Sequence, residues 1–375
     1  MIYFINVKNS SELLDITKKI QTDPRAFAYL LPKSNILHFY GEHVDYRAAA
    51  FLKQELLARG GDTIVTKHVI DGKSDFSDVL LMATPSQLKS LLEKLKSMDC
   101  WGLKSLREEL SEAFKNIYIK SWNIKKLRLD SDTKLMAIIN VTPDSFHEAS
   151  RFNENNILDT AEKFLSQGAE ILDIGAESTR PGFEPISAET ELERLIPALK
   201  ILRKNFQDTI ISVDTYKSKV ASVAINEGAD IINDISGFEF DSKMPDLIAK
   251  SEVPYVLSHY QKEPCENILS VMIKYFHEKL NYLYEKGVKR ENLILDPGLG
   301  FGKTNEDNFE IIKKLESLKI FGLPILVGHS RKRFTGKNLY ATVALSGILY
   351  GRANILRIHD VEENFHAISM ARGLN

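Results

Sequence analysis

The sequence predicts an α/β protein, a (β/α)8 barrel of the TIM type preceded by a small α/β domain. From residue 135 onward, eight short apolar runs each end in a polar residue. They alternate with stretches that carry apolar residues at three- and four-residue spacing, which is typical of parallel strands joined by helices. The repeating part spans about 235 residues, close to the roughly 250 of such barrels. A doubly wound sheet is the structural alternative, but the count of eight favours the barrel.

Each strand of the predicted barrel is a run of six or seven mostly apolar residues, and several of the helices between them end at a glycine. The strands are expected at 135–141, 170–176, 210–215, 231–236, 254–260, 293–298, 324–330 and 355–360. The helices are expected at 157–168, 188–204, 217–228, 243–252, 268–287, 306–318 and 339–352.

The part before the barrel has a different composition, rich in Lys, Glu, Leu and Ser and poor in glycine. We expect an accessory α/β domain at 1–120, a polar and basic linker at 121–134, and the barrel at 135–375. No catalytic constellation stands out in the first part. Its strands are expected at 36–41, 63–70 and 78–84, with helices after the first and third.

Composition narrows the class of protein. The formal net charge of -2 argues against a domain built around a nucleic-acid backbone. No apolar run reaches membrane-spanning length, and the first residues lack the pattern of a secretory signal. The two cysteines, Cys100 and Cys265, are too few for a disulfide framework and suit a reducing compartment. We therefore expect a cytoplasmic protein without nucleic-acid or membrane partners.

Polar residues stand at the carboxyl end of every predicted strand, where barrels of this type place their active sites. Asp214, Asn233 and Asp296 offer acceptors that suit the amino and ring N–H groups of a heterocycle. Asn140 offers an oxygen that suits Mg²⁺, with the remaining ligands supplied by substrate and water. The full set of strand-end groups is Asn140, Asp173, Asp214, Asn233 with Asp234, His259, Asp296, Ser330, and His359 with Asp360.

Positive charge gathers after the last two predicted strands. The run GHSRKRFTG carries Arg331, Lys332 and Arg333, and the eighth strand adds Arg357 and His359 on one face. This pattern indicates a site for a polyanion such as diphosphate. By contrast, the run DPGLGFGKT at 296–304 matches neither the phosphate-loop nor the dinucleotide-binding spacing. It predicts a flexible turn, with Asn305 capping the next helix.

Seven motifs in order resemble those of the dihydropteroate synthase family. They are NVTPDSF, DIGAESTRPG, SVDTYK, IINDISG, DPGLGFGKT, GHSRK and RIHDV, within residues 134–370. The resemblance implies an enzyme of folate synthesis, a homodimer. It joins 7,8-dihydropterin-6-ylmethyl diphosphate to 4-aminobenzoate by a dissociative mechanism and releases diphosphate, with Mg²⁺ as cofactor.

The resemblance also implies roles for individual residues. Asn140 is the expected Mg²⁺ ligand, and Arg357 and His359 belong to the diphosphate site. Asp214, Asn233, Asp296 and Lys332 correspond to the pterin-reading set, and Asp173 to an acid that lines the pocket. Lys332, Arg357 and His359 are the expected catalytic groups. Thr179, Arg180 and the loop with Ser330 lie on the aminobenzoate side, and Phe146 and Glu148 of the first loop are further expected substrate contacts.

The chain departs from the family pattern in three places. The usual Ser-Asp-Gly-Gly after the first motif is here His147 to Ser150, so both glycines are absent. Arg333 replaces a small residue, and Ser258 stands where the family has Met. Two other interpretations remain open. A methyltetrahydrofolate–corrinoid methyltransferase would need no diphosphate site, and a pterin-binding relative without activity would bind the diphosphate but form no product.

Overall fold

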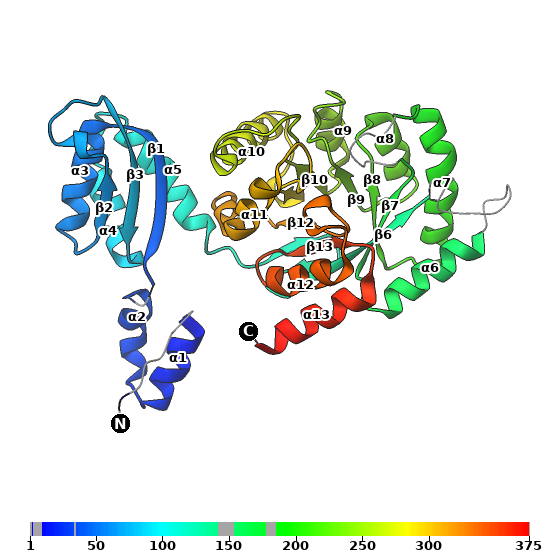
Figure 1. Cartoon of the computed structure of the whole chain (residues 1–375), viewed down its shortest axis with the longest axis horizontal. Coiled ribbons are helices and arrows are strands. Elements are labelled where there is room, and N and C mark those ends of the chain that lie inside the picture. The colour runs from blue at the N-terminus through cyan, green and yellow to red at the C-terminus, as the bar shows by residue number, and fades with distance from the viewer. Residues whose placement is uncertain (1, 3–9, 34, 142–153, 178–184, 375) are drawn as a thin grey trace. The chain divides into compact units, whose positions relative to one another are not determined.

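The computed structural model describes residues 2, 10–33, 35–141, 154–177 and 185–374, and divides the chain into two compact units, Met1–Lys115 and Asn116–Asn375 (Figure 1). The first unit is a small α/β domain, as predicted. Its three strands form an antiparallel sheet in the order β1-β3-β2, and α3 and α4 pack on β3. The strands are β1 (Leu37–Asp45), β2 (Asp62–Val65) and β3 (Phe76–Ala83), and the main helices are α1 (Ser10–Lys19), α2 (Phe27–Leu30), α3 (Tyr46–Leu57), α4 (Pro85–Leu95) and α5 (Leu103–Asn116).

Several features of this unit differ from the expectation, and α1 and α2 lie before the first element that was expected. The strand expected at 63–70 ends at Val65, and Lys67–Val69 form a 3-10 turn that buries Val69. Helix α5 was not predicted. Its amphipathic sequence, LKSLREELSEAFKN, buries Leu103, Leu110 and Phe114.

The second unit is the predicted (β/α)8 barrel, with eight parallel strands in the order β11-β10-β9-β8-β7-β6-β13-β12. The bridge between Leu295 and Ile325 joins the two ends of this order. The strands are β6 (Lys134–Asn140), β7 (Ile171–Gly175), β8 (Ile210–Asp214), β9 (Ile231–Asp234), β10 (Tyr255–Ser258), β11 (Leu293–Asp296), β12 (Leu326–Gly328) and β13 (Ile355–Ile358). The helices around them are α6 (Glu154–Ser166), α7 (Ala188–Asn205), α8 (Ser218–Asn226), α9 (Met244–Ser251), α10 (Ile268–Glu285), α11 (Asn305–Lys313), α12 (Leu339–Leu349) and α13 (Val361–Leu374).

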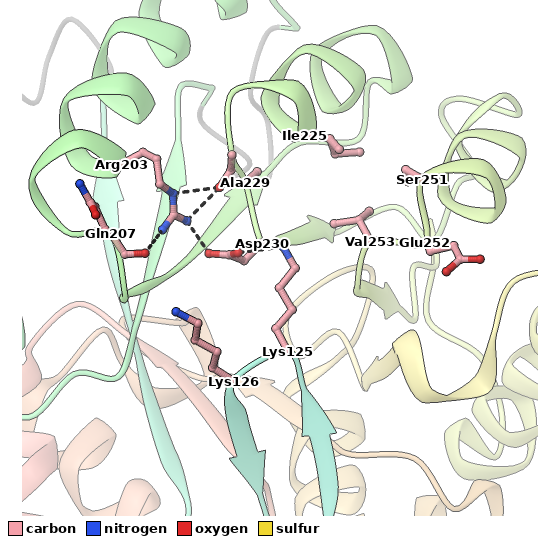
Figure 2. Close-up of a pocket in the computed structure, with 11 residues that line it drawn as sticks. Lys125, Lys126, Arg203, Gln207, Ile225, Ala229, Asp230, Ser251, Glu252 and Val253 are labelled. Atoms are coloured by element: carbon pink, nitrogen blue, oxygen red, sulfur yellow. Dashed lines mark hydrogen bonds and ion pairs between the residues drawn. The ribbon is translucent and has the colours of Figure 1, made fainter.

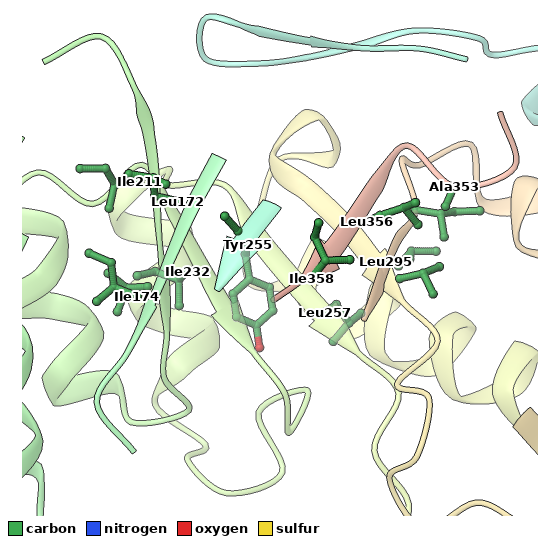
Figure 3. Close-up of a cluster of buried hydrophobic side chains, with 14 of the residues drawn as sticks. Leu172, Ile174, Ile211, Ile232, Tyr255, Leu257, Leu295, Ala353, Leu356 and Ile358 are labelled. Carbon is green, nitrogen blue, oxygen red and sulfur yellow. The ribbon is translucent and has the colours of Figure 1, made fainter. Parts of the chain in front are cut away.

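Alternate residues of the strands build two separate cores. One set packs outward against the helices, and Figure 3 shows members such as Leu172, Ile174 and Ile232. The other set, one residue out of phase, closes the amino-terminal end of the barrel. We call this second set the floor; it consists of Met136, Ile171, Ile210, Ile231, Val256, Ile294, Leu326 and Ile355.

The segment expected as a linker packs against this floor. Residues Trp122–Ile124 (β4) and Leu127–Leu129 (β5) form a hairpin, and Ile124 and Leu129 are buried against the floor residues. The indole Nε1 of Trp122 donates to the carbonyl of Gly322, 2.9 Å away. The polar and basic residues that suggested a linker lie on the exposed side of the hairpin. Because they outnumber the buried apolar residues, the composition of the segment did not indicate a packed hairpin. None of the described helices is long and apolar enough to cross a membrane.

Candidate active site

The candidate site lies on the inner face of the barrel, toward the carboxyl ends of the strands. Its residues follow the floor residues at intervals of two or four, and so they share the inward direction of the floor side chains. Asp173 follows Ile171, for example, and Arg357 follows Ile355. The inward residues found in this way are Asn140, Asp173, Ser212, Asp214, Asn233, Ser258, Asp296, Ser330, Arg357 and His359.

Arg357 lies between two carboxylates. Its Nε atom is 2.6 Å from Asp173 Oδ2, and its Nη2 atom is 2.5 Å from Asp214 Oδ2. Asn233 Nδ2 also donates to Asp173 Oδ2, at 3.3 Å. The neighbouring strands β7, β8 and β9, together with β13, thus contribute side chains to a single charged cluster inside the barrel.

Two acceptors of this cluster are not used by any of the described residues. Asp173 Oδ1 and Asp214 Oδ1 are buried and have no hydrogen-bond partner among the described residues. Burial raises the pKa of Asp214 to about 7, although Arg357 opposes the shift and Asp173 adds to it. Burial by itself would lower the pKa of Arg357, but Asp173 and Asp214 raise it above its ordinary value. A buried carboxylate with a free oxygen suits a ligand that presents N–H donors.

Asp296 and Lys332 form the second part of the site. Asp296 Oδ1 accepts the N–H of Gly298 at 2.9 Å, and Oδ2 lies 3.3 Å from the hydroxyl of Ser258. Burial raises the pKa of Asp296. Burial also lowers the pKa of Lys332 to about 8, and Asp296 opposes this shift. The ammonium of Lys332 lies over the ring of Phe301, 4.3 Å from its centroid, which is a favourable cation–π distance.

His359 and Ser330 meet at the ends of β12 and β13. Ser330 Oγ accepts the backbone N–H of His359 at 3.2 Å and lies 3.0 Å from His359 Nδ1. A Ser330 hydroxyl that donates to Nδ1 would leave the ring proton on Nε2, where it could be donated to a ligand.

The structure therefore brings together six of the residues selected from the sequence, Asp173, Asp214, Asn233, Asp296, Lys332 and Arg357. It also pairs Ser330 with His359 at the ends of β12 and β13. Two other cations of the basic run do not join them. Arg331 is exposed and paired with Asp360 at 2.5 Å, and Arg333 is exposed as well. Phe146, Glu148, Thr179 and Arg180 lie outside the described residues.

Asn140, the expected metal ligand, is half-buried at the end of β6 and pairs in register with Gly175 of β7. Among the described residues, no group of three or more His, Cys, Asp or Glu side chains is arranged to hold a metal ion. A single amide oxygen fits an ion that receives most of its ligands from the substrate and from water.

Several residues of the site were missed in the sequence. Ser258, Ser212 and Phe301 were not selected, although the alternation from Val256 and Ile210 identifies the two serines as inward. Lys217, which follows SVDT, forms ion pairs with the buried Glu177 and Glu191. Hydroxyls and paired side chains carry no distinctive sequence pattern, so only the strand register could have identified them.

A hollow of about 430 Å³ lies at the opposite, amino-terminal end of the barrel (Figure 2). Its cations are already neutralised. Lys125 and Arg203 are paired with Asp230, and Lys126 is paired with Asp208. Arg203 also donates to the backbone carbonyls of Gln207 and Gly228. These contacts identify Arg203 as a structural link between loops, and the chemistry belongs to the other end.

Comparison with known proteins agrees with this geometry. The sequence profile of the family described as "Pterin binding enzyme" matches residues 136–359. The dihydropteroate synthase of Clostridium beijerinckii is 40% identical over 258 residues, which cover 66% of this chain and 96% of that protein. This chain belongs to the dihydropteroate synthase family. The structure of the Clostridium difficile dihydropteroate synthase, solved in the presence of pteroic acid, superposes with a TM-score of 0.62 at 37% identity, covering 65% of this chain and 97% of that one.

Some members of the dihydropteroate synthase family share more than the barrel. A probable bifunctional folylpolyglutamate synthase/dihydropteroate synthase of Halobacterium salinarum is 35% identical over 351 residues. The match covers 88% of this chain and 42% of that protein. The matched part of this chain is longer than the barrel unit Asn116–Asn375, so the similarity extends into Met1–Lys115.

Proposed function

We propose that this chain catalyses the condensation of 7,8-dihydropterin-6-ylmethyl diphosphate with 4-aminobenzoate to 7,8-dihydropteroate and diphosphate. The observation that carries this proposal is the buried cluster of Arg357, Asp173 and Asp214 with its two unused carboxylate oxygens. It offers acceptors for the N–H groups of a pterin and a cation for the diphosphate, both within one barrel. The rival methyltransferase reaction has no use for such a cation.

The pterin is proposed to bind with its donor edge toward Asp214. The free Oδ1 atom of Asp214 is placed to accept from the ring, and Asn233 and Asp296 offer further acceptors. The ammonium of Lys332 supplies a donor beside them. Negative charge around the ring stabilises a pterin that becomes positive when the leaving group departs.

Arg357 and His359 are proposed to stabilise the leaving group. Nε and Nη2 of Arg357 bind the two aspartates, whereas Nη1 makes no hydrogen bond among the described residues. The remaining N–H groups of this planar fork, together with His359 Nε2, are donors for diphosphate oxygens. The methylene C–O bond breaks, and its electron pair leaves on the diphosphate oxygen. The nitrogen of 4-aminobenzoate then forms the C–N bond and loses one proton.

The aminobenzoate side is proposed to include Thr179, Arg180 and the loop with Ser330, together with Phe146 and Glu148 of the first loop. A weakly basic arylamine needs placement against the methylene more than activation. Arg333, which stands where the family has a small residue, is exposed.

We also propose Mg²⁺ as the cofactor, bound by Asn140 and by diphosphate oxygens. When bound, the ion would neutralise part of the charge that develops on the leaving diphosphate. The protein contributes one neutral oxygen, so its affinity for Mg²⁺ without substrate is expected to be low. A reaction in the cytoplasm agrees with the two cysteines, both of which are free thiols.

The test is to mix the purified full chain with Mg²⁺, the pterin diphosphate and 4-aminobenzoate, and to measure dihydropteroate by mass spectrometry. Omission of Mg²⁺ should reduce the rate and weaken binding of the pterin diphosphate, but not binding of a pterin without diphosphate. A chain that binds the pterin diphosphate and forms no product would be a pterin-binding relative without activity. Absence of pterin binding would overturn the proposal.

Replacing Asp214 with asparagine should weaken pterin binding by about 1–3 kcal/mol, because the amide presents an N–H to a ring donor. The pKa of Asp214 is raised to about 7 in the folded chain, so the ionised form that accepts from the pterin forms as the pH rises through 7. Pterin affinity measured by calorimetry should therefore increase between pH 6 and 8 in the original chain, and this increase should be absent or smaller in the variant.

The raised pKa of Asp214 also predicts that Asp214→Asn stabilises the folded chain at neutral and alkaline pH. A carboxyl group with a raised pKa destabilises the folded chain as the pH rises from about 4, the ordinary value, to about 7. The variant without ligand should thus melt at the same or a higher temperature at pH 8. Asp208→Asn, an exposed position paired with Lys126 at the other end of the barrel, is the matched control. Unchanged pterin affinity in Asp214→Asn would mean that Asp214 has only a structural role.

We propose a homodimer through helix α12. This helix has no charged residue, and it buries Leu345 and Leu349 while Tyr340 and Ile348 are 82% and 57% exposed. An apolar helix face of this kind is a site for association with a second copy. Ile348→Lys should yield a monomer in sedimentation analysis, whereas the control Val271→Lys on α10 should not. If the chain without substitutions is a monomer, this face of α12 is not a dimer interface, and the proposal of a homodimer through it is wrong.

A further inference from the structure

The loops that follow β10 and β11 meet at a buried lysine. Lys303 Nζ lies 3.0 Å from the carbonyl oxygen of His259, 2.8 Å from that of Gly298 and 3.2 Å from that of Phe301. An ammonium has three N–H donors, and each of these finds one acceptor. The sequence predicted a flexible turn here, with Asn305 as the helix cap. Instead, the buried ammonium of Lys303 hydrogen-bonds to backbone carbonyls of the turn itself. Thr304 caps α11 through a capping box with Asp307.

Two glycines allow the loops to approach so closely. Gly298 has φ +63°, and a Cβ atom there would lie 2.1 Å from the carbonyl oxygen of His259. Gly302 has φ +61°, and a Cβ atom there would lie 1.9 Å from the carbonyl oxygen of Gln261. Gln261 Nε2 donates to the carbonyl of Gly302 at 3.0 Å. The contact between the two loops is therefore made by backbone, and the ammonium lies at its centre.

The turn that Lys303 holds carries two parts of the pterin site. The N–H of Gly298 donates to Asp296 Oδ1, and the ring of Phe301 lies under the ammonium of Lys332. The carbonyls of these same two residues accept from Lys303. A change at Lys303 is thus transmitted through the backbone of Gly298 to Asp296, and through the backbone and ring of Phe301 to Lys332.

We propose that Lys303 is a positioning residue of the synthase, which fixes Asp296 and Lys332 in the orientation that binds the pterin. This inference rests on the proposed function. Among the described residues, Lys303 Nζ donates to backbone carbonyls and not to the side chains of Asp296 or Lys332, so it acts through the backbone of residues 298–301. Its effect should therefore appear in pterin affinity and leave the additional affinity due to the diphosphate unchanged.

The protonation state of Lys303 supports this role. Burial lowers the pKa of Lys303 to about 7; Asp296, Asp307 and Cys265 oppose this shift, and Lys332 adds to it. A neutral amine has only two N–H donors and leaves one of the three carbonyls without a partner. The complete set of bonds thus requires the ammonium form. A ligand that needs Asp296 and Lys332 in place favours this form.

The test uses the full chain with Lys303→Met, which keeps the length of the side chain and removes its donors. The dissociation constants of 6-hydroxymethylpterin and of the pterin diphosphate are measured by calorimetry, with denaturant unfolding of the same samples. We expect both constants to rise about 10-fold or more, with their ratio unchanged, and Lys303→Arg to restore part of the loss. The control is Lys314→Met, directly after the last residue of α11, which removes an exposed lysine paired with Glu310.

Each outcome has a defined meaning. A folded Lys303→Met chain with unchanged pterin affinity would overturn the inference, even if its stability had fallen. If the original chain binds no pterin, the proposed function fails and the inference fails with it. If Lys303→Met does not fold, the pterin affinity of Gln261→Ala is measured instead. This variant removes the hydrogen bond to Gly302 between the same two loops and leaves Lys303 in place. Weaker pterin binding in that variant supports the inference, and unchanged binding overturns it.

Discussion

Replacing Arg357 with alanine should lower turnover by about 10²-fold or more, because the main charge partner of the leaving group is lost. A side chain at the mouth of a barrel would be expected to affect folding little, but the contacts of Arg357 predict a loss of stability as well. Arg357 neutralises the buried Asp173 and Asp214, and removal of one partner of a buried ion pair costs about 3–5 kcal/mol. The variant should melt at a lower temperature at pH 8 and recover part of this stability below pH 7, because the pKa of Asp214 is already raised to about 7 by burial.

Arg357→Lys separates these two effects. A lysine keeps the positive charge but cannot bridge two carboxylates and a diphosphate with one ammonium. This variant should fold with a smaller loss of stability and still turn over slowly. Arg331→Ala, which removes the exposed arginine paired with Asp360, is the control and should be nearly neutral. A stable Arg357→Lys chain with near-normal turnover would rule out the assignment of Arg357 to the leaving group.

Replacing Leu129 with alanine should destabilise the barrel by about 2–5 kcal/mol, as for other fully buried leucines. Leu129 is fully buried against the floor, although it lies in a segment whose composition suggests a linker. The measurement is the free energy of unfolding in urea. Arg128→Ala, one residue earlier on the exposed side of the same strand, is the matched control and should change stability by less than about 0.5 kcal/mol. Equal effects at the two positions would mean that the hairpin does not close the barrel.

The same hairpin determines where the catalytic unit begins. We propose that the barrel carries the activity and that Met1–Lys115 form an accessory domain. Asn116 belongs to the barrel unit, because its side chain donates to the carbonyl of Ile320 and accepts from Arg290. A chain that starts at Asn116 should therefore make dihydropteroate, whereas one that starts at Ser131 lacks the hairpin and should not fold stably. A folded chain from Asn116 without activity would show that the first domain contributes to the site.

The order and approximate bounds of the barrel strands could be predicted from the sequence. Runs such as LMAIINV and EILDIGA are short, apolar and rich in β-branched residues, and each carries a polar residue, Asn140 or Asp173, at or beyond its midpoint, so local propensity and burial agree. The expected strand at 170–176 is Ile171–Gly175 in the structure, and that at 355–360 is Ile355–Ile358. The site acids were visible for the same reason, because the alternation that buries Ile171 also directs Asp173 inward.

What the sequence determined by itself is therefore local: which runs become strands, which residues share a face, and which charged residues stand at the strand ends. The tertiary structure decided which of these groups meet. Arg357 and Asp173 are distant in the chain, and only closure of the barrel brings Nε of Arg357 to 2.6 Å from the carboxylate. The same holds for Lys303 and the carbonyl of His259, and for Leu129 and the floor. The physical reason is that backbone propensity and side-chain alternation act over a few residues, whereas ion pairs, buried hydrogen bonds and packing depend on the distances between separate strands.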